Sequence, residues 1–105
     1  MTRTQREHPE AAAELDAAVG WYEEQEPGIG LALIDRARQA RRDIDDWPHA
    51  APTFATADDG TVIRGKAVRG YPYRIIYTVE PDTILILAYA HQRREPKYWL
   101  RRLDG

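Results

Sequence analysis

The sequence contains no cysteine, no serine and no asparagine. Without cysteine there is no disulfide, no thiolate metal site and no cysteine nucleophile, and the lack of serine removes every serine nucleophile. No glycine precedes the Lys-Ser or Lys-Thr pair of a P-loop. The segment that begins Gly28-Ile29-Gly30 has Leu33 where a dinucleotide-binding fingerprint needs its third glycine. These absences exclude many common enzyme classes.

Long apolar runs are also missing. No stretch approaches the ~20 residues that cross a bilayer, and Met1–Glu10 is polar, without the apolar core of a secretion signal. We therefore expect a cytoplasmic protein that does not contact a membrane. His8, His49 and His91 are far apart in the sequence, so we expect no metal site and no cofactor. The 105 residues, 43% of them hydrophobic, suffice for a single domain spanning residues 1–105.

Charge is unevenly distributed along the chain, although the net charge is only −2. From Glu7 to Glu26 there are seven acidic residues and no lysine or arginine, whereas from His91 to Arg102 five basic residues stand against the single acid Glu95. We interpret the acidic stretch as a solvated helix face. The basic segment favours a surface that contacts an acidic partner.

Hydrophobic spacing in the first half predicts two helices. His8-Pro9-Glu10 is typical of a helix start, and apolar residues recur at intervals of three and four as far as Tyr22. Glu26-Pro27-Gly28 ends this helix. A second apolar stripe runs from Ile29 to Trp47, where Pro48 stops it. Two helices joined by so short a break should form an antiparallel αα-hairpin.

The second half predicts strands. Residues 48–61 are expected to be loop, and strands are expected at residues 62–69, 71–79 and 83–90. Because 83–90 is almost wholly apolar, we expect a central strand that is covered on both faces. Thr2–Glu7 is a weaker candidate for a further strand, since it is polar. The predicted fold is α+β: an antiparallel αα-hairpin packed on a small twisted antiparallel sheet of three to four strands.

The densest group of chemically useful side chains is His91–Trp99, directly after the apolar strand. Arg69 and Arg74 should lie nearby on the preceding strands, giving a basic surface at one end of the sheet. The alternative is a solvated tail with Trp99 packed on the core. A pair of catalytic carboxylates is a further possibility, but nothing singles out two of the 17 acidic residues.

Several motifs occur in a characteristic order. A helix opens with His-Pro-Glu-Ala (8–11) and continues with Ala-Val-Gly-Trp-Tyr-Glu-Glu-Gln (18–25), followed by Pro-Gly-Ile-Gly (27–30) and a second helix that ends in Asp-Trp-Pro (46–48). Val-Arg-Gly-Tyr-Pro-Tyr-Arg-Ile-Ile-Tyr (68–77) and Ile-Leu-Ala-Tyr-Ala-His-Gln-Arg-Arg-Glu-Pro-Lys-Tyr-Trp (86–99) complete the series. The chain thus resembles the RelE/ParE superfamily of bacterial type II toxins, especially its ParE-like plasmid-stabilisation branch.

The resemblance implies a cognate antitoxin whose C-terminal segment wraps the helical hairpin and neutralises the toxin. It also implies that operator DNA is bound only through the antitoxin, with a heterotetramer as the expected assembly. For antitoxin binding we expect exposed apolar side chains on the hairpin, at Leu31, Leu33 and Ile34.

The superfamily divides by target. Its RelE-like branch cuts mRNA in the ribosome, with arginines and lysines on the sheet and an acid/base residue near the C-terminus. Arg69 and Arg93 match the arginines of that branch, but Gly60 and Val62 stand where its lysines would be. Its terminal catalytic tyrosine aligns with Trp99, and Tyr98 is one position away. The nuclease set is incomplete, so a protein that is not an enzyme is favoured.

Three hypotheses follow. The first is a ParE-like toxin that inhibits DNA gyrase, with target-binding residues Arg69, Arg74, Arg93, Arg94, Tyr98 and Trp99. The second is a ribosome-dependent endonuclease, in which Arg69 and Arg93 hold phosphate and Tyr98 or His91 supplies a proton. The third is an inactive module that only binds an antitoxin.

Overall fold

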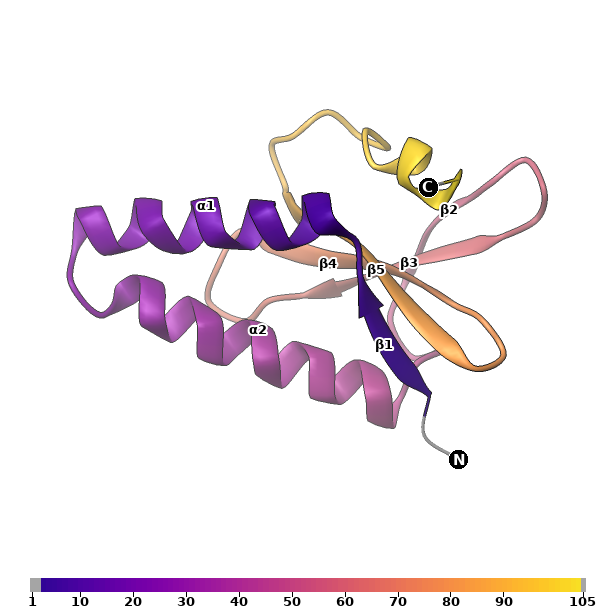
Figure 1. The fold of residues 1–105 in the computed structure, drawn as a ribbon, viewed down its shortest axis with the longest axis horizontal. Coiled ribbons are helices and arrows are strands. Elements are labelled where there is room, and N and C mark those ends of the chain that lie inside the picture. The colour runs from indigo at the N-terminus through magenta and orange to yellow at the C-terminus, as the bar shows by residue number, and fades with distance from the viewer. Residues whose placement is uncertain (1–2, 105) are drawn as a thin grey trace.

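The structure is a computed structural model that describes residues 3–104. Its elements follow in the order β1 (Thr4–Glu7), α1 (Pro9–Gln25), α2 (Ile29–Asp46), β2 (Thr53–Thr56), β3 (Val62–Ala67), β4 (Tyr73–Val79), β5 (Thr83–His91) and the 3-10 helix η1 (Leu100–Asp104). The two helices run antiparallel and extend beyond the sheet at one side (Figure 1). The predicted α+β fold with an αα-hairpin is confirmed. No helix among residues 3–104 has the length and apolar character needed to span a bilayer.

The helical hairpin begins and turns as the sequence predicts. His8 is the N-cap of α1, because its Nδ1 accepts a hydrogen bond from the Glu10 backbone N–H, and Pro9 occupies the first turn. Gly28 adopts a left-handed conformation with φ of 96° before α2. The Glu23 carboxylate accepts hydrogen bonds from the backbone N–H groups of Gly28 and Leu31, which lower the pKa of Glu23. The side chain therefore caps the start of the second helix.

The sheet has five strands in the order β1-β5-β4-β3-β2, one more than the predicted maximum. β1 pairs with β5 in parallel, and the other pairs are antiparallel. The weak prediction of a first strand is confirmed for Thr4–Glu7, whereas Thr2 lies outside the described residues. The prediction of loop throughout 48–61 is wrong, since β2 forms the outer edge there. This four-residue strand is mostly exposed and lacks the apolar alternation that reveals a strand.

A bulge in β5 distributes its apolar residues between the two faces of the sheet. Ile76 of β4 pairs with Ala88 and Tyr77 pairs with Ile86, so that Leu87 has no partner residue opposite it. Ile86 belongs to the core beneath the helices, whereas Leu87 and Ala88 both belong to the core on the other face. The prediction that this strand is covered on both faces is confirmed, although β4 and not β5 is the middle strand.

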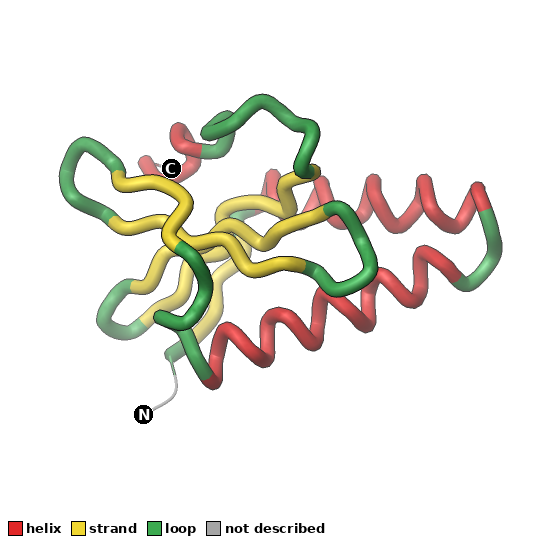
Figure 2. The backbone as a smooth tube through the Cα atoms, turned by 180° about the vertical axis from the view of Figure 1, so that it is seen from behind, coloured by secondary structure: helices red, strands yellow, loops and turns green. Residues whose placement is uncertain are grey.

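Two different coverings enclose the sheet. The helices cover one face, where the buried residues include Leu33, Ala37 and Ile44 of α2 and Ile75, Tyr77 and Ile84 of the sheet. The chain after β5, residues 92–104, covers the other face through Trp99 and is called the strap below. Figure 2 shows the sheet from behind, with the strap passing over it as a long loop that ends in the short helix η1.

Candidate functional site

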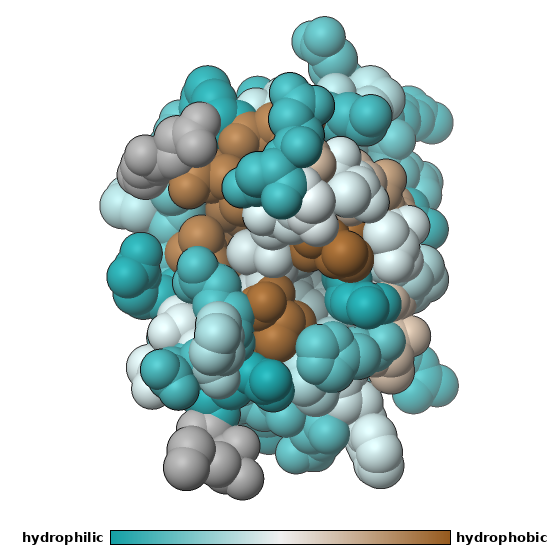
Figure 3. Space-filling model, turned by 90° about the vertical axis from the view of Figure 1, so that its right-hand side faces the viewer, coloured by the Kyte–Doolittle hydropathy of each residue, from teal (hydrophilic) through white to brown (hydrophobic). Residues whose placement is uncertain are grey.

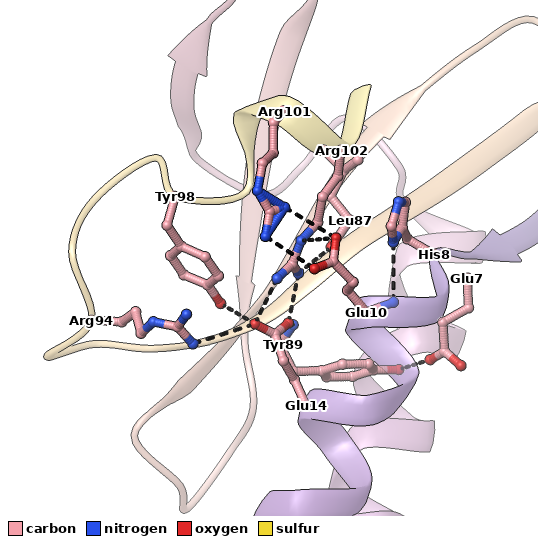
Figure 4. Close-up of polar contacts among 10 residues, drawn as sticks. All are labelled: Glu7, His8, Glu10, Glu14, Leu87, Tyr89, Arg94, Tyr98, Arg101 and Arg102. Atoms are coloured by element: carbon pink, nitrogen blue, oxygen red, sulfur yellow. Dashed lines mark hydrogen bonds and ion pairs between the residues drawn. The ribbon is translucent and has the colours of Figure 1, made fainter. Parts of the chain in front are cut away.

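The outer edge of β5 is completed by side chains. β1 pairs with β5 only as far as Ile86, so the following residues have no neighbouring strand on that side. There the Leu87 carbonyl accepts a hydrogen bond from Arg102 (2.9 Å), and the Tyr89 N–H donates to Glu14 (3.1 Å). Glu14 and Arg102 are themselves an ion pair at 2.9 Å (Figure 4). One buried ion pair thus occupies the position of a missing strand.

Glu14 also fixes the strap. The Tyr98 hydroxyl donates a hydrogen bond of 2.6 Å to Glu14, and the Arg94 guanidinium lies 3.7 Å from the same carboxylate (Figure 4). The Glu14 side chain is 15% exposed and that of Arg102 is 4% exposed, so the pair is largely removed from water. Burial raises the pKa of the Tyr98 hydroxyl, and the hydrogen bond to Glu14 raises it further. Next to this group, Arg101 forms a bidentate pair with Glu10 at the exposed surface.

The acidic stretch is therefore not simply a solvated face. Glu10 and Glu14 pair with the strap, and Glu7 pairs with Arg41 of α2 and accepts a hydrogen bond from Tyr89. The interpretation from sequence is wrong for Glu7 and Glu14, which are partly buried, because their partners lie far away in the chain: Glu14 and Arg102 are 88 positions apart. Glu10 is exposed, although it pairs with Arg101. Three of the five basic residues in His91–Arg102 are held by carboxylates of α1.

A second group of arginines lies at one end of the sheet and is called the sheet-end arginines: Arg69, Arg74, Arg93 and Arg94. Arg69 lies in the turn between β3 and β4, and Arg93 directly follows β5. The two segments meet where the Gln92 N–H donates to the Pro72 carbonyl (2.9 Å). Within residues 3–104, the guanidinium groups of Arg69, Arg74 and Arg93 form no ion pair, and all three residues are exposed. This end of the sheet carries uncompensated positive charge.

An aromatic residue that the sequence analysis missed lies beside this group. Phe54 of β2 is 44% exposed, and the Arg74 guanidinium lies over its ring at 5.1 Å from the centroid. Gly65 of β3 makes room for the ring, since a Cβ there would be only 3.0 Å from Phe54 Cδ1. A single phenylalanine within a predicted loop gave no sign of this position. Its ring forms one wall of a cleft of about 110 Å³, and the strap forms the other.

Trp99 packs in the core on the strap face of the sheet. Trp99 is 3% exposed and packs with Ile76 and Leu87, so its assignment to a target-binding surface is wrong. The alternative, in which Trp99 packs on the core, is confirmed for this residue. The indole ring is the largest apolar side chain of the strap, and its burial attaches the strap to the sheet.

His91 is held by the turn that follows β5. Its Nδ1 accepts a hydrogen bond from the Arg93 N–H (3.0 Å), and its ring meets that of Tyr73 edge to face at 5.1 Å. Among residues 3–104, no three His, Cys, Asp or Glu side chains are grouped as metal ligands. The two contacts of His91 hold its ring at the turn that carries Arg93.

The three residues predicted to bind an antitoxin differ in exposure. Leu31 is 61% exposed and Ile34 is partly buried, whereas Leu33 is 1% exposed. Exposure of Leu33 was a wrong prediction, because this residue lies on the side of α2 that packs in the main core. Trp21 of α1 is 57% exposed and was not predicted.

A larger hollow of about 1,000 Å³ lies at the opposite end of the strands from the sheet-end arginines. Its lining includes Val62, Leu85 and Leu103 together with charged residues of both signs, such as Asp59 and Arg64. Figure 3 faces this side of the molecule and shows hydrophobic side chains within a hydrophilic surround. Because both charge signs are mixed, the lining favours no single class of ligand.

Comparisons with known proteins identify the family and the fold. Residues 6–96 match the family described as ParE toxin of type II toxin-antitoxin system, parDE. A solved structure entitled "Chromosomal ParDE TA system from P. aeruginosa" has the same fold, with a TM-score of 0.71 and 18% identity over 85% of this chain and 95% of that chain. No curated protein gave a significant sequence match. Because the family match spans most of the sequence, the chain belongs to the ParE toxin family of type II toxin–antitoxin systems.

Proposed function

We propose that the protein is a toxin that inhibits DNA gyrase by binding to it, and that a cognate antitoxin neutralises it. The family match supports the toxin role. Inhibition by binding, without RNA cleavage, is favoured mainly by Tyr98. Its hydroxyl donates a hydrogen bond to Glu14, and its pKa is raised. The sheet end thus offers uncompensated arginines for binding, while the Tyr98 hydroxyl is already bound to Glu14.

RNA cleavage requires a proton donor and a proton acceptor close to the scissile phosphate. Trp99 is buried and its indole N–H is not a useful acid. Raising the pKa of Tyr98 makes this hydroxyl a weaker acid at neutral pH, and Glu14 already takes its hydrogen bond. Binding by Arg69, Arg74, Arg93 and Arg94 needs none of these groups, which favours inhibition by contact over hydrolysis.

The direct test is a supercoiling assay with purified gyrase and purified toxin. We expect loss of supercoiling as toxin is added, and recovery when antitoxin is mixed in first. A catalytically inert protein should produce no RNA fragments in a parallel translation reaction. Full supercoiling activity at a large molar excess of toxin over gyrase would contradict the proposal.

A ribosome-dependent endonuclease is the second candidate. Arg69 and Arg93 come from two segments that meet at the sheet end, which suits two side chains that bind the same phosphate. His91 adjoins Arg93. Mapping of mRNA cuts in a translating extract distinguishes the candidates. Cuts in the ribosomal A site that disappear in Arg93→Ala would establish cleavage and exclude a purely binding toxin.

Antitoxin binding is proposed on the helical hairpin. Leu31 and Trp21 are large exposed apolar side chains there, and a segment that folds on docking gains stability by burying such surface. We expect Leu31→Asp to weaken the complex with antitoxin about tenfold or more, with Arg38→Asp as an exposed α2 control. Light scattering of the complex would test for a heterotetramer. Growth unaffected by expression of the toxin alone would favour an inactive module.

A further inference from the structure

The cleft beside Phe54 has one wall from β2 and β4 and one from the strap, and each wall carries a guanidinium group over an aromatic ring. On one side Arg74 lies over the Phe54 ring, and on the other Arg94 lies over the Tyr98 ring at 4.0 Å from its centroid. The floor between them is apolar and includes Ile76, Ala90 and Trp99. Glu95 is the one acidic side chain among the described residues that line the cleft. A small apolar depression is thus flanked by two guanidinium groups.

The size of the cleft limits what enters it. Its volume of about 110 Å³ is below that of a cavity of ~150 Å³ that holds one benzene molecule, and below the ~300–1,000 Å³ of typical small-molecule sites. A nucleotide or a cofactor is too large for this space. An aliphatic side chain such as leucine has a suitable size, which indicates a protein segment as the occupant.

The aromatic rings also argue against nucleic acid. Proteins that bind single strands stack bases on uncovered aromatic rings. Here the Phe54 ring rests against Gly65 and carries Arg74, while two guanidinium groups, of Arg94 and Arg102, lie over the Tyr98 ring. Arg102 is buried in its pair with Glu14, but Arg74 is exposed and Arg94 is 55% exposed although it lies 3.7 Å from Glu14. The guanidinium groups of Arg74 and Arg94 are therefore accessible to carboxylates of a partner beside the cleft.

We propose that this cleft binds one apolar side chain of a protein partner, and that carboxylates flanking this side chain in the partner pair with Arg74 and Arg94. The inference deepens the proposed function, because it gives the sheet-end arginines a protein ligand of defined chemistry. The partner segment has an apolar residue between acidic ones. Phe54 then determines specificity by forming the apolar wall that excludes polar residues from the cleft.

The test is an NMR titration of the ¹⁵N-labelled protein with the blocked peptide Glu-Glu-Leu-Glu-Glu, its alanine counterpart and a single-stranded tetranucleotide. We expect the leucine peptide to shift the resonances of Phe54 and the side-chain Nε signals of Arg74 and Arg94. The alanine peptide should bind about fivefold more weakly, since it buries less apolar surface. The tetranucleotide should leave the Phe54 signals unchanged.

Two variants keep the result specific. Phe54→Ala and Arg74→Ala should each weaken leucine-peptide binding about fivefold or more, whereas Trp47→Ala removes an aromatic ring that is 72% exposed elsewhere and should have no effect. Equal binding of both peptides, unchanged binding by the two variants, or tighter binding of the tetranucleotide at Phe54 would overturn the inference. Because gyrase is absent from the titration, failure of gyrase inhibition would leave this result standing, and the reverse also holds.

Discussion

The two faces of the sheet are covered in different ways. On the helix face, apolar side chains of α1 and α2 pack against Ile75, Tyr77 and Ile84, and the covering elements are 17 and 18 residues long. On the strap face, one buried tryptophan and the Glu14–Arg102 pair hold an irregular segment in place. The comparison teaches that a small protein can replace a missing layer of secondary structure by a few specific contacts.

The comparison also distinguishes arginines that are held in ion pairs within the protein from arginines that are available to a partner. Arg101 and Arg102 are basic residues of the strap, but carboxylates of α1 hold them. Arg69 and Arg93 lie at the sheet end and form no ion pair among residues 3–104. Arg101 and Arg102 are therefore structural, whereas the sheet-end arginines are assigned to target binding. Arg94 belongs to both groups, because it lies 3.7 Å from Glu14 but its side chain is 55% exposed.

The largest expected effect is on the strap face. Trp99→Ala removes the main apolar contact of the strap and should lower the free energy of unfolding by about 3–5 kcal/mol. Trp47→Ala is the matched control, since Trp47 is 72% exposed and should change stability by less than about 0.5 kcal/mol. Urea unfolding followed by circular dichroism measures both. Similar losses for the two variants would show that the strap does not depend on Trp99.

The next effect is that of the buried ion pair. Glu14→Gln removes the closer carboxylate of Arg102, at 2.9 Å, and leaves only Glu10 at 3.5 Å, so it should cost about 2–4 kcal/mol in the free energy of unfolding. Glu10 is itself 46% exposed and pairs with the exposed Arg101 as well as, at 3.5 Å, with Arg102. Glu10→Gln should therefore cost less, about 1 kcal/mol or below. The double variant Glu14→Gln/Arg102→Met should recover part of the loss, and a purely additive result would contradict a direct coupling.

A smaller loss is expected where the helices meet. A Cβ at Gly30 would lie 2.3 Å from the Val19 carbonyl oxygen, so Gly30→Ala should force the helices apart and cost about 1–3 kcal/mol. Gly20→Ala is the control within α1, since nothing lies within 4 Å of its added Cβ. That variant should stabilise the helix by up to about 1 kcal/mol. Thermal melting of both variants would show whether the close approach of the two helices is needed for the stability of the helix face.

The smallest effect is a pH dependence of the free energy of unfolding that arises from Tyr98 in the strap. Burial and the hydrogen bond to Glu14 raise the pKa of Tyr98, so the folded state favours the protonated hydroxyl. This contribution is fully present below the unfolded pKa of about 10 and is lost as the pH rises toward the folded value. Between pH 9 and 11 the wild-type protein should lose stability more steeply than Tyr98→Phe. Parallel curves would contradict ionisation of Tyr98 as a cause.

The helix face could be predicted from sequence and the strap face could not. Apolar spacing from Leu33 to Ile44 lies within one segment, so a single stripe reveals both the helix and its buried side. The contact of Glu14 with Arg102 joins the two ends of the chain, and no local pattern records it. β2 escaped prediction because its four residues are mostly exposed. Phe54 escaped with it, since its importance depends on Gly65 and Arg74 of neighbouring strands.

The candidate site was also predicted only in part, because local sequence patterns place strands and turns but not long-range contacts. The positions of Arg69 and Arg93 followed from the predicted strands, because a turn and a strand end were expected at one end of the sheet. Burial of Trp99 depends on which side of an irregular segment meets the core, and tertiary packing sets that side. Leu33 belongs to the apolar stripe of α2, so the stripe already indicated its burial, and the prediction that Leu33 is exposed conflicted with it.

The most direct test compares gyrase inhibition by two double variants with that of the wild-type toxin. Arg69→Ala/Arg93→Ala removes two sheet-end arginines, and Arg36→Ala/Arg38→Ala removes the same charge from the exposed side of α2. The account predicts that the first variant inhibits supercoiling about tenfold less well or worse, while the second inhibits like the wild type. Undiminished inhibition by the sheet-end variant, or an equal loss in both, would contradict the assignment of this surface to the target.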